Sequence, residues 1–286
     1  MPSLIDIRRR VRSVKNTQQI TKAMKMVSAA KLRKAQEKAL AARPYAKMLQ
    51  QMLANVAEAA SQAGDGETHP LLAVRPEKRI LLVVLTADGG LAGGFNSNLI
   101  KVAHRFANEH KSEQLSFELI GRKGRDYFKR RFPTIAGEHL DVFRNVKFET
   151  AEKIVQAIID RFVKAEIDSV YLFVNEFKSV MSSTIAQTRL LPIEVPKSAA
   201  PVDYIYEQPP EEILKSLLPR YLNVQIYRAL LESAAAYLAA RMTAMDAATR
   251  NADDVIDKLT LYMNRVRQAS ITREIIEVVS GAAALE

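Results

Sequence analysis

Apolar residues recur along the C-terminal part of the chain at alternating steps of four and three residues. From Leu231 to Val266 this spacing meets an apolar side chain at ten of eleven positions, and the exception is Thr249. A sustained repeat of 3.5 residues is typical of a left-handed coiled coil. There is no glycine or proline from Arg220 to Ser280. The pattern therefore predicts one long helix in this part of the chain.

A similar pattern fills the N-terminal part of the chain. Alanine and leucine residues follow the same spacing from Leu32 to Val56. An earlier apolar seam starts at Leu4 and is interrupted by the polar run 16–19. We expect Pro44 to bend this N-terminal helix or to end it locally. After this polar run, the seam that starts at Leu4 is predicted to resume at Ile20, Met24 and Val27.

Both predicted helices are far longer than the average globular helix. At about 1.5 Å per residue each would extend about 90 Å, and such a length requires a partner helix. If the two helices pair within one chain, they must run antiparallel. Homodimerisation would satisfy the apolar pattern equally well, so the pattern alone leaves both arrangements open.

The residues between the two long helices have a strand-like composition. Apolar runs alternate there with amphipathic helical patterns, which is typical of a mostly parallel α/β sheet. The segment 183–195 predicts an added edge strand that ends at Pro192. The other predicted strands are 79–86, 114–121 and 169–177, and the predicted helices are 96–110, 122–131 and 150–166.

Positive charge is concentrated at the N-terminus. The whole chain has a formal net charge of +10, and residues 1–60 alone carry this surplus, with thirteen basic and three acidic side chains. A localised basic surface indicates an acidic partner or phosphate groups. Nucleic-acid binding is therefore an alternative function, although no aromatic residue precedes Tyr45 to stack on single-stranded bases. The most concentrated basic residues are Arg8, Arg9, Arg10 and Arg12.

The stretch TADGGLAGGFN (86–96) follows an apolar strand and precedes a predicted helix. Such turns hold phosphate in many proteins, but this spacing matches neither a dinucleotide turn nor a P-loop. We expect a structural turn, with Asn96 as the cap of the next helix and Asp88 bonded to its own loop. The alternative is an enzyme that uses Asp88 and bound nucleotide. The four glycines of the turn are Gly89, Gly90, Gly93 and Gly94.

Other chemistry is not indicated. The chain has no cysteine, which excludes disulfides and thiolate metal sites. Its four histidines are scattered and no catalytic set is recognisable, so we expect no metal, no cofactor and no enzyme activity of the chain itself. There is neither a run of about 18 apolar residues nor a signal peptide, and we expect a soluble or peripheral protein.

The C-terminal tip is apolar around much of its helix. Such a helix is typically enclosed by more than one neighbour, which a hairpin within one chain would not require. The pattern therefore predicts that a sleeve formed by other chains encloses the tip. The tip residues are Ile271, Ile275, Ile276, Val278 and Val279.

Three stretches, 15–36, 86–96 and 241–285, closely resemble the γ subunits of F-type ATP synthase, and the likeness covers the chain end to end. The resemblance implies a rotor shaft, a non-catalytic subunit that binds no nucleotide. An antiparallel coiled coil would turn inside a hexamer of α and β subunits, while the α/β domain contacts the ε subunit and the membrane c ring. The localisation implied is the cytoplasmic face of a bacterial inner membrane, with a processed organellar chain as the alternative.

The resemblance also assigns contact residues. Met24 and Lys25 match positions that face an acidic loop of β, and the apolar tip would turn in a collar of α and β. The basic residues 8–12 are placed on the shaft surface. Arg267, Gln268 and Thr272 match polar contacts with loops of β, and Tyr204, Tyr206 and Glu207 match the foot that contacts ε and the c ring.

The residues and the resemblance together predict an α/β fold. A long antiparallel coiled coil of the N- and C-terminal helices is joined to a central, mostly parallel, Rossmann-like α/β domain. The predicted segments are an N-terminal helix at 1–63, the α/β domain at 77–197 and a C-terminal helix at 210–286.

Overall fold

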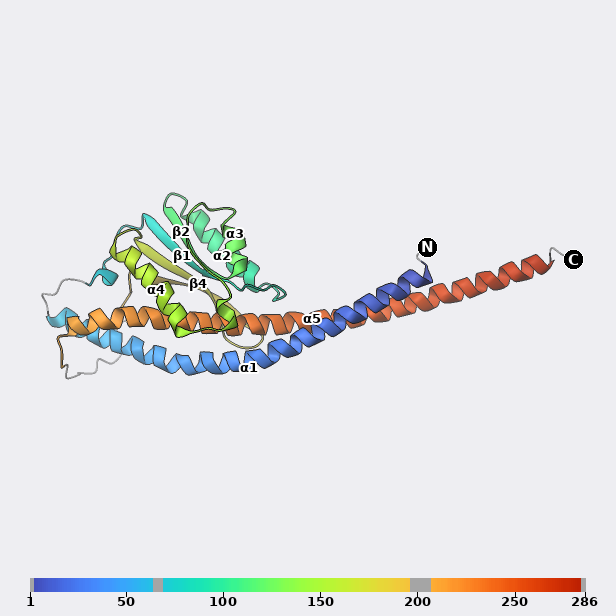
Figure 1. Ribbon diagram of the computed structural model, residues 1–286, viewed down its shortest axis with the longest axis horizontal. Coiled ribbons are helices and arrows are strands. Elements are labelled where there is room, and N and C mark those ends of the chain that lie inside the picture. The colour runs from blue at the N-terminus through green and yellow to red at the C-terminus, as the bar shows by residue number, and fades with distance from the viewer. Residues whose placement is uncertain (1–2, 64–68, 196–206, 284–286) are drawn as a thin grey trace. The chain divides into compact units, whose positions relative to one another are not determined.

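A computed structural model of the chain describes residues 3–63, 69–195 and 207–283 (Figure 1). The chain divides into two compact units. Unit 1 contains residues 1–28 and 242–286, and unit 2 contains residues 29–241. Each long helix contributes to both units, so the units do not coincide with the three predicted segments, and that segmentation stays a prediction.

Two helices account for nearly half of the chain. Helix α1 runs from Leu4 to Ala63 over 60 residues, and helix α5 runs from Pro210 to Ala283 over 74 residues. The Ser3 hydroxyl accepts a hydrogen bond from the Asp6 amide and so caps the start of α1. Helix α1 continues through Pro44, so the expectation that Pro44 ends it locally is wrong.

In unit 1, α1 and α5 pair within a single chain. Thr21 and Thr249 are joined through their hydroxyl oxygens at 2.8 Å, and Lys25 Nζ donates to Asp246 Oδ1 at 2.5 Å. Gln18 donates to Asp253 in the same series. Residue numbers fall along α5 as they rise along α1, so the two helices run antiparallel. The apolar repeat of the two helices, which on its own also allowed homodimerisation, is thus satisfied by pairing within one chain.

The seam of α1 does not change phase where the sequence pattern suggested. Ile20 and Val27, expected to resume it, are 59% and 54% exposed. The same heptad instead continues from the apolar residues near the N-terminus into polar ones. These polar seam residues are Gln18, Thr21, Lys25 and Ser28, which are half-buried or buried.

Unit 2 contains a five-stranded sheet in the order β3-β2-β1-β4-β5. Strands β1 to β4 are parallel, and β5 is antiparallel at the edge, which confirms the mostly parallel sheet and the predicted edge strand. Strand β3 was missed by the sequence pattern. The strands are β1 Arg79–Leu85, β2 Gln114–Ile120, β3 Ile135–His139, β4 Ser169–Phe177 and β5 Ser183–Leu191.

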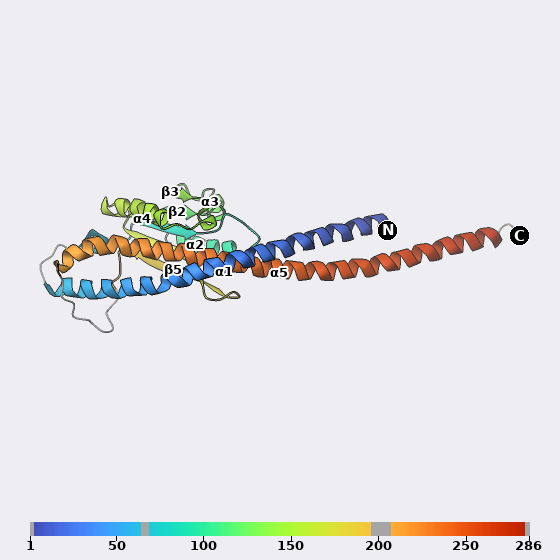
Figure 2. The same ribbon diagram turned by 60° about the horizontal axis from the view of Figure 1, so that its bottom comes forward.

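Helices cover both faces of this sheet (Figures 1 and 2). Alternate side chains of a strand point to opposite faces. In β1, Leu82 packs with residues of α2 and α3, whereas Val83 packs with residues of α1, α4 and α5. The remaining elements are α2 Phe95–Glu109, α3 Arg122–Phe128, α4 Phe148–Val163 and the 3-10 helices η1 Pro70–Leu72 and η2 Val142–Arg144.

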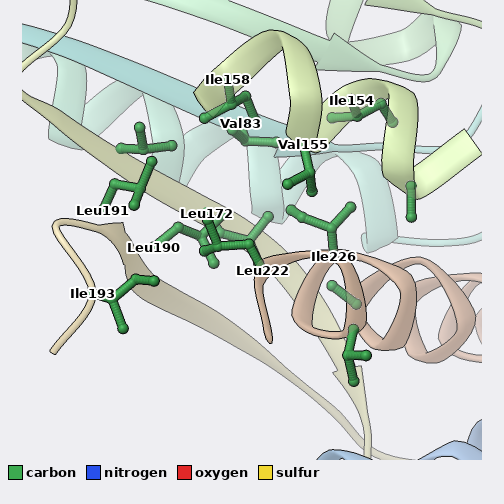
Figure 3. Packing of buried hydrophobic residues seen from close by; sticks show 14 of the residues in the cluster. Val83, Ile154, Val155, Ile158, Leu172, Leu190, Leu191, Ile193, Leu222 and Ile226 are labelled. Atoms are coloured by element: carbon green, nitrogen blue, oxygen red, sulfur yellow. The ribbon is translucent and has the colours of Figure 1, made fainter. Parts of the chain in front are cut away.

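The larger core joins the sheet to α4 and α5. In Figure 3, Val155 and Ile158 of α4 and Leu222 and Ile226 of α5 point toward Leu172 of β4. Leu53 of α1, which is fully buried, belongs to the same core. Since such burial contributes roughly 1.5–3 kcal/mol for each large side chain, both long helices are firmly held to the sheet within unit 2.

An ion pair joins the amino ends of β1 and β4. The Arg79 guanidinium donates two hydrogen bonds to Asp168, at 2.7 and 3.1 Å, and the Arg79 amide donates a third at 2.9 Å. The Asp168 side chain is 5% exposed. These bonds, above all those from the guanidinium, lower the pKa of Asp168. Folding therefore stabilises the ionised carboxylate.

We expect Asp168→Asn to lower the free energy of unfolding by about 1–2 kcal/mol at pH 7, because hydrogen bonds to a charged group are lost. A lowered pKa contributes stability above the unfolded value of about 3.9, and this contribution is lost as the pH falls through the folded value. Urea unfolding of the full chain at pH 7 and near pH 3 should show a difference between the two chains that shrinks at low pH. Asp257→Asn, at an exposed carboxylate, is the control, and an equal difference at both pH values would contradict the assignment.

Candidate functional site

The glycine turn lies where open α/β sheets usually bind ligands. It follows the carboxyl end of β1, and the direction of strand order reverses between β1 and β4. Two of its residues, Leu91 and Gly93, have positive φ angles of 59° and 54°. The position of the turn therefore permits a ligand site, and the neighbouring side chains decide whether room exists for one.

A side chain of the same chain fills the space beside the turn. Tyr237 of α5 is 8% exposed and makes an edge contact with Phe95, with 5.6 Å between ring centroids. A Cβ atom on Gly89 would lie 2.4 Å from the Tyr237 hydroxyl oxygen. Arg241 donates a hydrogen bond to that oxygen at 3.2 Å. A larger residue at position 89 would force the Tyr237 hydroxyl to move, and this close approach supports the structural interpretation of the turn.

Asn96 and Asp88 hold the turn in ways that differ from the prediction. Asn96 does not cap α2, because Gly94 occupies that position. Its side chain instead accepts from the Ala87 amide at 2.9 Å and donates to the Gly89 carbonyl at 3.2 Å. Asp88 does not bond to its own loop. It accepts a hydrogen bond from the Arg122 amide at 3.0 Å, which joins the turn to the start of α3.

A second close approach was not found from the sequence. Gly121 follows β2 with φ of 89°, and a Cβ atom there would lie 2.0 Å from the carbonyl oxygen of Thr86. The Thr86 hydroxyl is buried, donates to the Ile120 carbonyl at 3.0 Å and accepts from the Gly124 amide at 2.8 Å. These contacts join the ends of β1 and β2. The only signal in the sequence was a glycine directly after an apolar run.

The residues expected to face an acidic loop of β lie in unit 1. Met24 is half-buried. Lys25, with 43% of its side chain exposed, is paired with Asp246, which also forms an ion pair with Arg250 at 3.0 Å. The hydrogen bond from Lys25 lowers the pKa of Asp246. An acidic partner would therefore compete with Asp246 for Lys25.

The predicted contacts near the C-terminus lie on one exposed stretch of α5. Arg267, Gln268 and Thr272 are all exposed, and the Thr272 hydroxyl donates to the Gln268 carbonyl at 2.9 Å. The apolar tip follows directly. Its exposed fractions are 48% for Ile271, 57% for Ile275, 58% for Ile276, 72% for Val278 and 62% for Val279.

The other predicted surface residues are solvent-exposed where the structure describes them. Arg8, Arg10 and Arg12 are exposed, and Arg9 lies 3.8 Å from Asp6. Glu207 is exposed, whereas Tyr204 and Tyr206 lie outside the described residues. The contacts predicted for all of these residues stay predictions.

Within unit 2, a cavity of about 180 Å³ lies between β4, β5 and α5. Each of its charged side chains has an ion-pair partner within the chain; among these pairs, Glu232 lies 3.2 Å from Arg43 and Arg189 lies 2.8 Å from Glu77. This pairing leaves no charge that calls for a ligand.

Among the described residues, no group of three or more histidine, aspartate or glutamate side chains is suited to hold a metal ion. Within the same residues, every helix is too short or too polar to span a bilayer.

Comparison with known proteins gives one consistent family. A family model described as ATP synthase matches residues 3–285. The chain is 62% identical to the ATP synthase gamma chain of Solibacter usitatus and 50% identical to that of Pelotomaculum thermopropionicum, each over all of both chains.

Solved structures show the same fold. The central stalk and c-ring structure of Tetrahymena thermophila mitochondrial ATP synthase contains a chain 27% identical to this one, with a TM-score of 0.61 over 80% of this chain and 99% of that chain. A chain of Euglena gracilis mitochondrial ATP synthase has a TM-score of 0.67 at 18% identity and covers 99% of this chain and 94% of its own. At that identity the second likeness concerns the fold alone.

Proposed function

Because this chain belongs to the family of ATP synthase gamma chains, and is a non-catalytic central-stalk subunit, we propose that it transmits torque between a ring of membrane c subunits and the catalytic β subunits. The coupling ion is a proton or sodium. In this proposal rotation of the chain forces the β sites in turn through different nucleotide affinities. The chain itself holds no nucleotide, which agrees with a glycine turn occupied by Tyr237.

The apolar tip carries the proposal. Five isoleucine and valine side chains on one stretch of α5 are 48–72% exposed, and a cluster of this kind indicates a partner surface. An apolar collar formed by α and β subunits would cover it. Apolar contact is non-directional and leaves no buried hydrogen bond to break at each angle, so such a collar permits rotation.

Polar residues near the tip supply the specific contacts in this proposal. Arg267, Gln268 and Thr272 would bind loops of the β subunit, and the exposure of all three residues supports this role. Met24 and Lys25 would meet the acidic loop of β. The basic residues 8–12 would line the shaft surface, and residues 204–207 would contact ε and the c ring.

We place the chain, as a peripheral subunit, at the cytoplasmic face of a bacterial inner membrane. The gamma chains that match over their full length, such as that of Solibacter usitatus, support this location. The nucleic-acid-binding alternative is not favoured, because the match to gamma chains includes the basic N-terminal residues.

The first test is ATP hydrolysis by α and β subunits from the same organism, mixed with and without this chain. Sustained turnover and a single complex that forms only with the chain are the expected results. The pair Arg267→Ala, Gln268→Ala should reduce turnover without preventing folding, since both side chains are exposed. Failure of the chain to associate with α and β would refute the proposal.

A further inference from the structure

Lys25, which the proposed function places against an acidic loop of β, already has a carboxylate partner in unit 1. Its Nζ donates to Asp246 Oδ1 at 2.5 Å. Both side chains remain partly open to solvent, with 43% of Lys25 and 33% of Asp246 exposed. Arg250 lies 3.0 Å from the other oxygen of the same carboxylate, and 72% of its side chain is exposed. Asp246 therefore holds two cations on a surface that another molecule can reach.

The helix backbones keep this carboxylate beside Lys25. Met245, which precedes Asp246, is 5% exposed, and Ser28, one turn after Lys25, is 3% exposed. The hydrogen bond from Lys25 lowers the pKa of Asp246, so the carboxylate is ionised at neutral pH. A partner within the same chain has an effective concentration that dilution does not change. Asp246 is therefore always available to Lys25.

Any acidic partner of Lys25 must displace Asp246. Ion pairs exposed to this degree contribute little net free energy, so the exchange is easy in both directions. The displacement weakens binding of the acidic partner, and the return of Asp246 gives Lys25 a counter-ion as soon as that partner leaves. Arg267, another cationic contact proposed for β, differs in this respect, because it forms no ion pair within the described part of the chain.

We propose that Asp246 is an exchangeable counter-ion, which alternates with the acidic loop of β as the partner of Lys25. This inference rests on the proposed function, in which the contact between Lys25 and β forms and breaks as the chain turns. Without Asp246, each release of the loop would leave the ammonium group unpaired, and the contact would be harder to break. Asp246 is thus a positioning residue that acts through Lys25.

Asp246→Asn removes the counter-ion and nearly preserves the shape of the side chain. In reconstitution with α and β at low ionic strength, two changes in opposite directions are expected. The chain concentration that restores half of the full turnover should fall about two- to five-fold, and the maximal turnover should fall by a similar factor, since exposed ion pairs have effects of this size. A merely structural defect would instead weaken assembly.

Two controls separate the exchange from a general effect of charge. Asp254→Asn removes the same charge from an exposed position of α5 that makes no bond to Lys25 within the described residues, and it should behave as the parent chain. In a Lys25→Gln background, Asp246→Asn should change neither assembly nor turnover, because the freed cation is absent. Raising the salt concentration should also reduce the difference between Asp246→Asn and the parent chain.

Unchanged or weaker assembly of Asp246→Asn would overturn the inference, and so would a slower turnover that persists in the Lys25→Gln background. If circular dichroism shows that Asp246→Asn loses helix content, Asp246→Ala repeats the test with the residue that best favours a helix. The two proposals fail differently. A parent chain that does not associate with α and β removes both, whereas a parent chain that supports turnover no differently from Asp246→Asn removes only this inference.

Discussion

Gly121→Ala is expected to prevent unit 2 from folding. The φ angle of 89° places Gly121 in a region that L residues rarely adopt, and the added Cβ atom would lie 2.0 Å from the Thr86 carbonyl oxygen and 2.6 Å from its carbon. Both are backbone atoms of a residue tied to Ile120 by its amide at 2.8 Å. Backbone strain and overlap together should lower the free energy of unfolding by more than about 4 kcal/mol.

The matched control is Gly281→Ala. Gly281 lies inside α5, and a Cβ atom there meets nothing within 4 Å. Alanine is favoured over glycine in a helix by about 0.5–1 kcal/mol, so this variant should fold at least as well as the parent chain. Thermal unfolding followed by circular dichroism separates the two variants. A Gly121→Ala chain that unfolds within a few degrees of the parent would show that the β1 and β2 ends are adaptable.

Ile275→Asp combined with Val279→Asp is expected to weaken the support of ATP hydrolysis by the chain at least a hundred-fold. The two side chains are 57% and 62% exposed, so the isolated chain should fold as before. Inside an apolar collar, however, two unpaired carboxylates would each cost several kcal/mol. We therefore expect at least a hundred-fold weaker assembly with α and β, measured as the chain concentration that restores half of the full turnover.

Ser270→Asp adds a charge to a polar position of the same helix and serves as the control. Ser270 is exposed and bonds to Glu274 at 3.2 Å. This variant should support turnover at a concentration close to that of the parent chain. Equal behaviour of the double aspartate variant and this control would mean that no apolar collar encloses the tip, and the torque proposal would then lose its main support.

The regular parts of the fold were predictable because they rest on apolar periodicity. The repeat from Leu231 to Val266 required a long helix with a partner, and the apolar runs required buried strands. Strand β3 was missed because Ile135–His139 is short, lies at the sheet edge and includes Gly137. Gly137 leaves room for Glu118, since a Cβ atom there would lie 2.0 Å from a Glu118 carboxylate oxygen.

The phase of the α1 seam was mispredicted because apolarity alone was used to choose it. Ile20, Met24 and Val27 are apolar at helical spacing, yet Ile20 and Val27 face outward. The true seam residues, Thr21 and Lys25, lie on the same heptad that joins the apolar seam from Leu4 to the one from Leu32. They are polar because they pair with residues of α5 more than 220 residues away in the sequence, and apolarity alone passes over such positions.

The glycine turn shows the same limit of sequence reasoning. Its spacing argued against a phosphate site, but the reason for glycine at position 89 is the Tyr237 hydroxyl, which comes from α5. Asn96 was expected to cap α2 because asparagine favours that position, whereas it satisfies the backbone of the turn that precedes the helix. The local preference of asparagine identified Asn96 as a residue that satisfies backbone groups here, but it predicted the wrong backbone groups.

Tyr237 also determines how the glycine turn would respond to a competing molecule. Its ring belongs to the chain and is held in place by a helix packed on the same core, so its effective concentration at the turn does not fall when the protein is diluted. A free aromatic ligand would have to displace it and leave a large side chain without its contacts. Inhibitors of this subunit are therefore better directed at the exposed surfaces of its helices than at the turn.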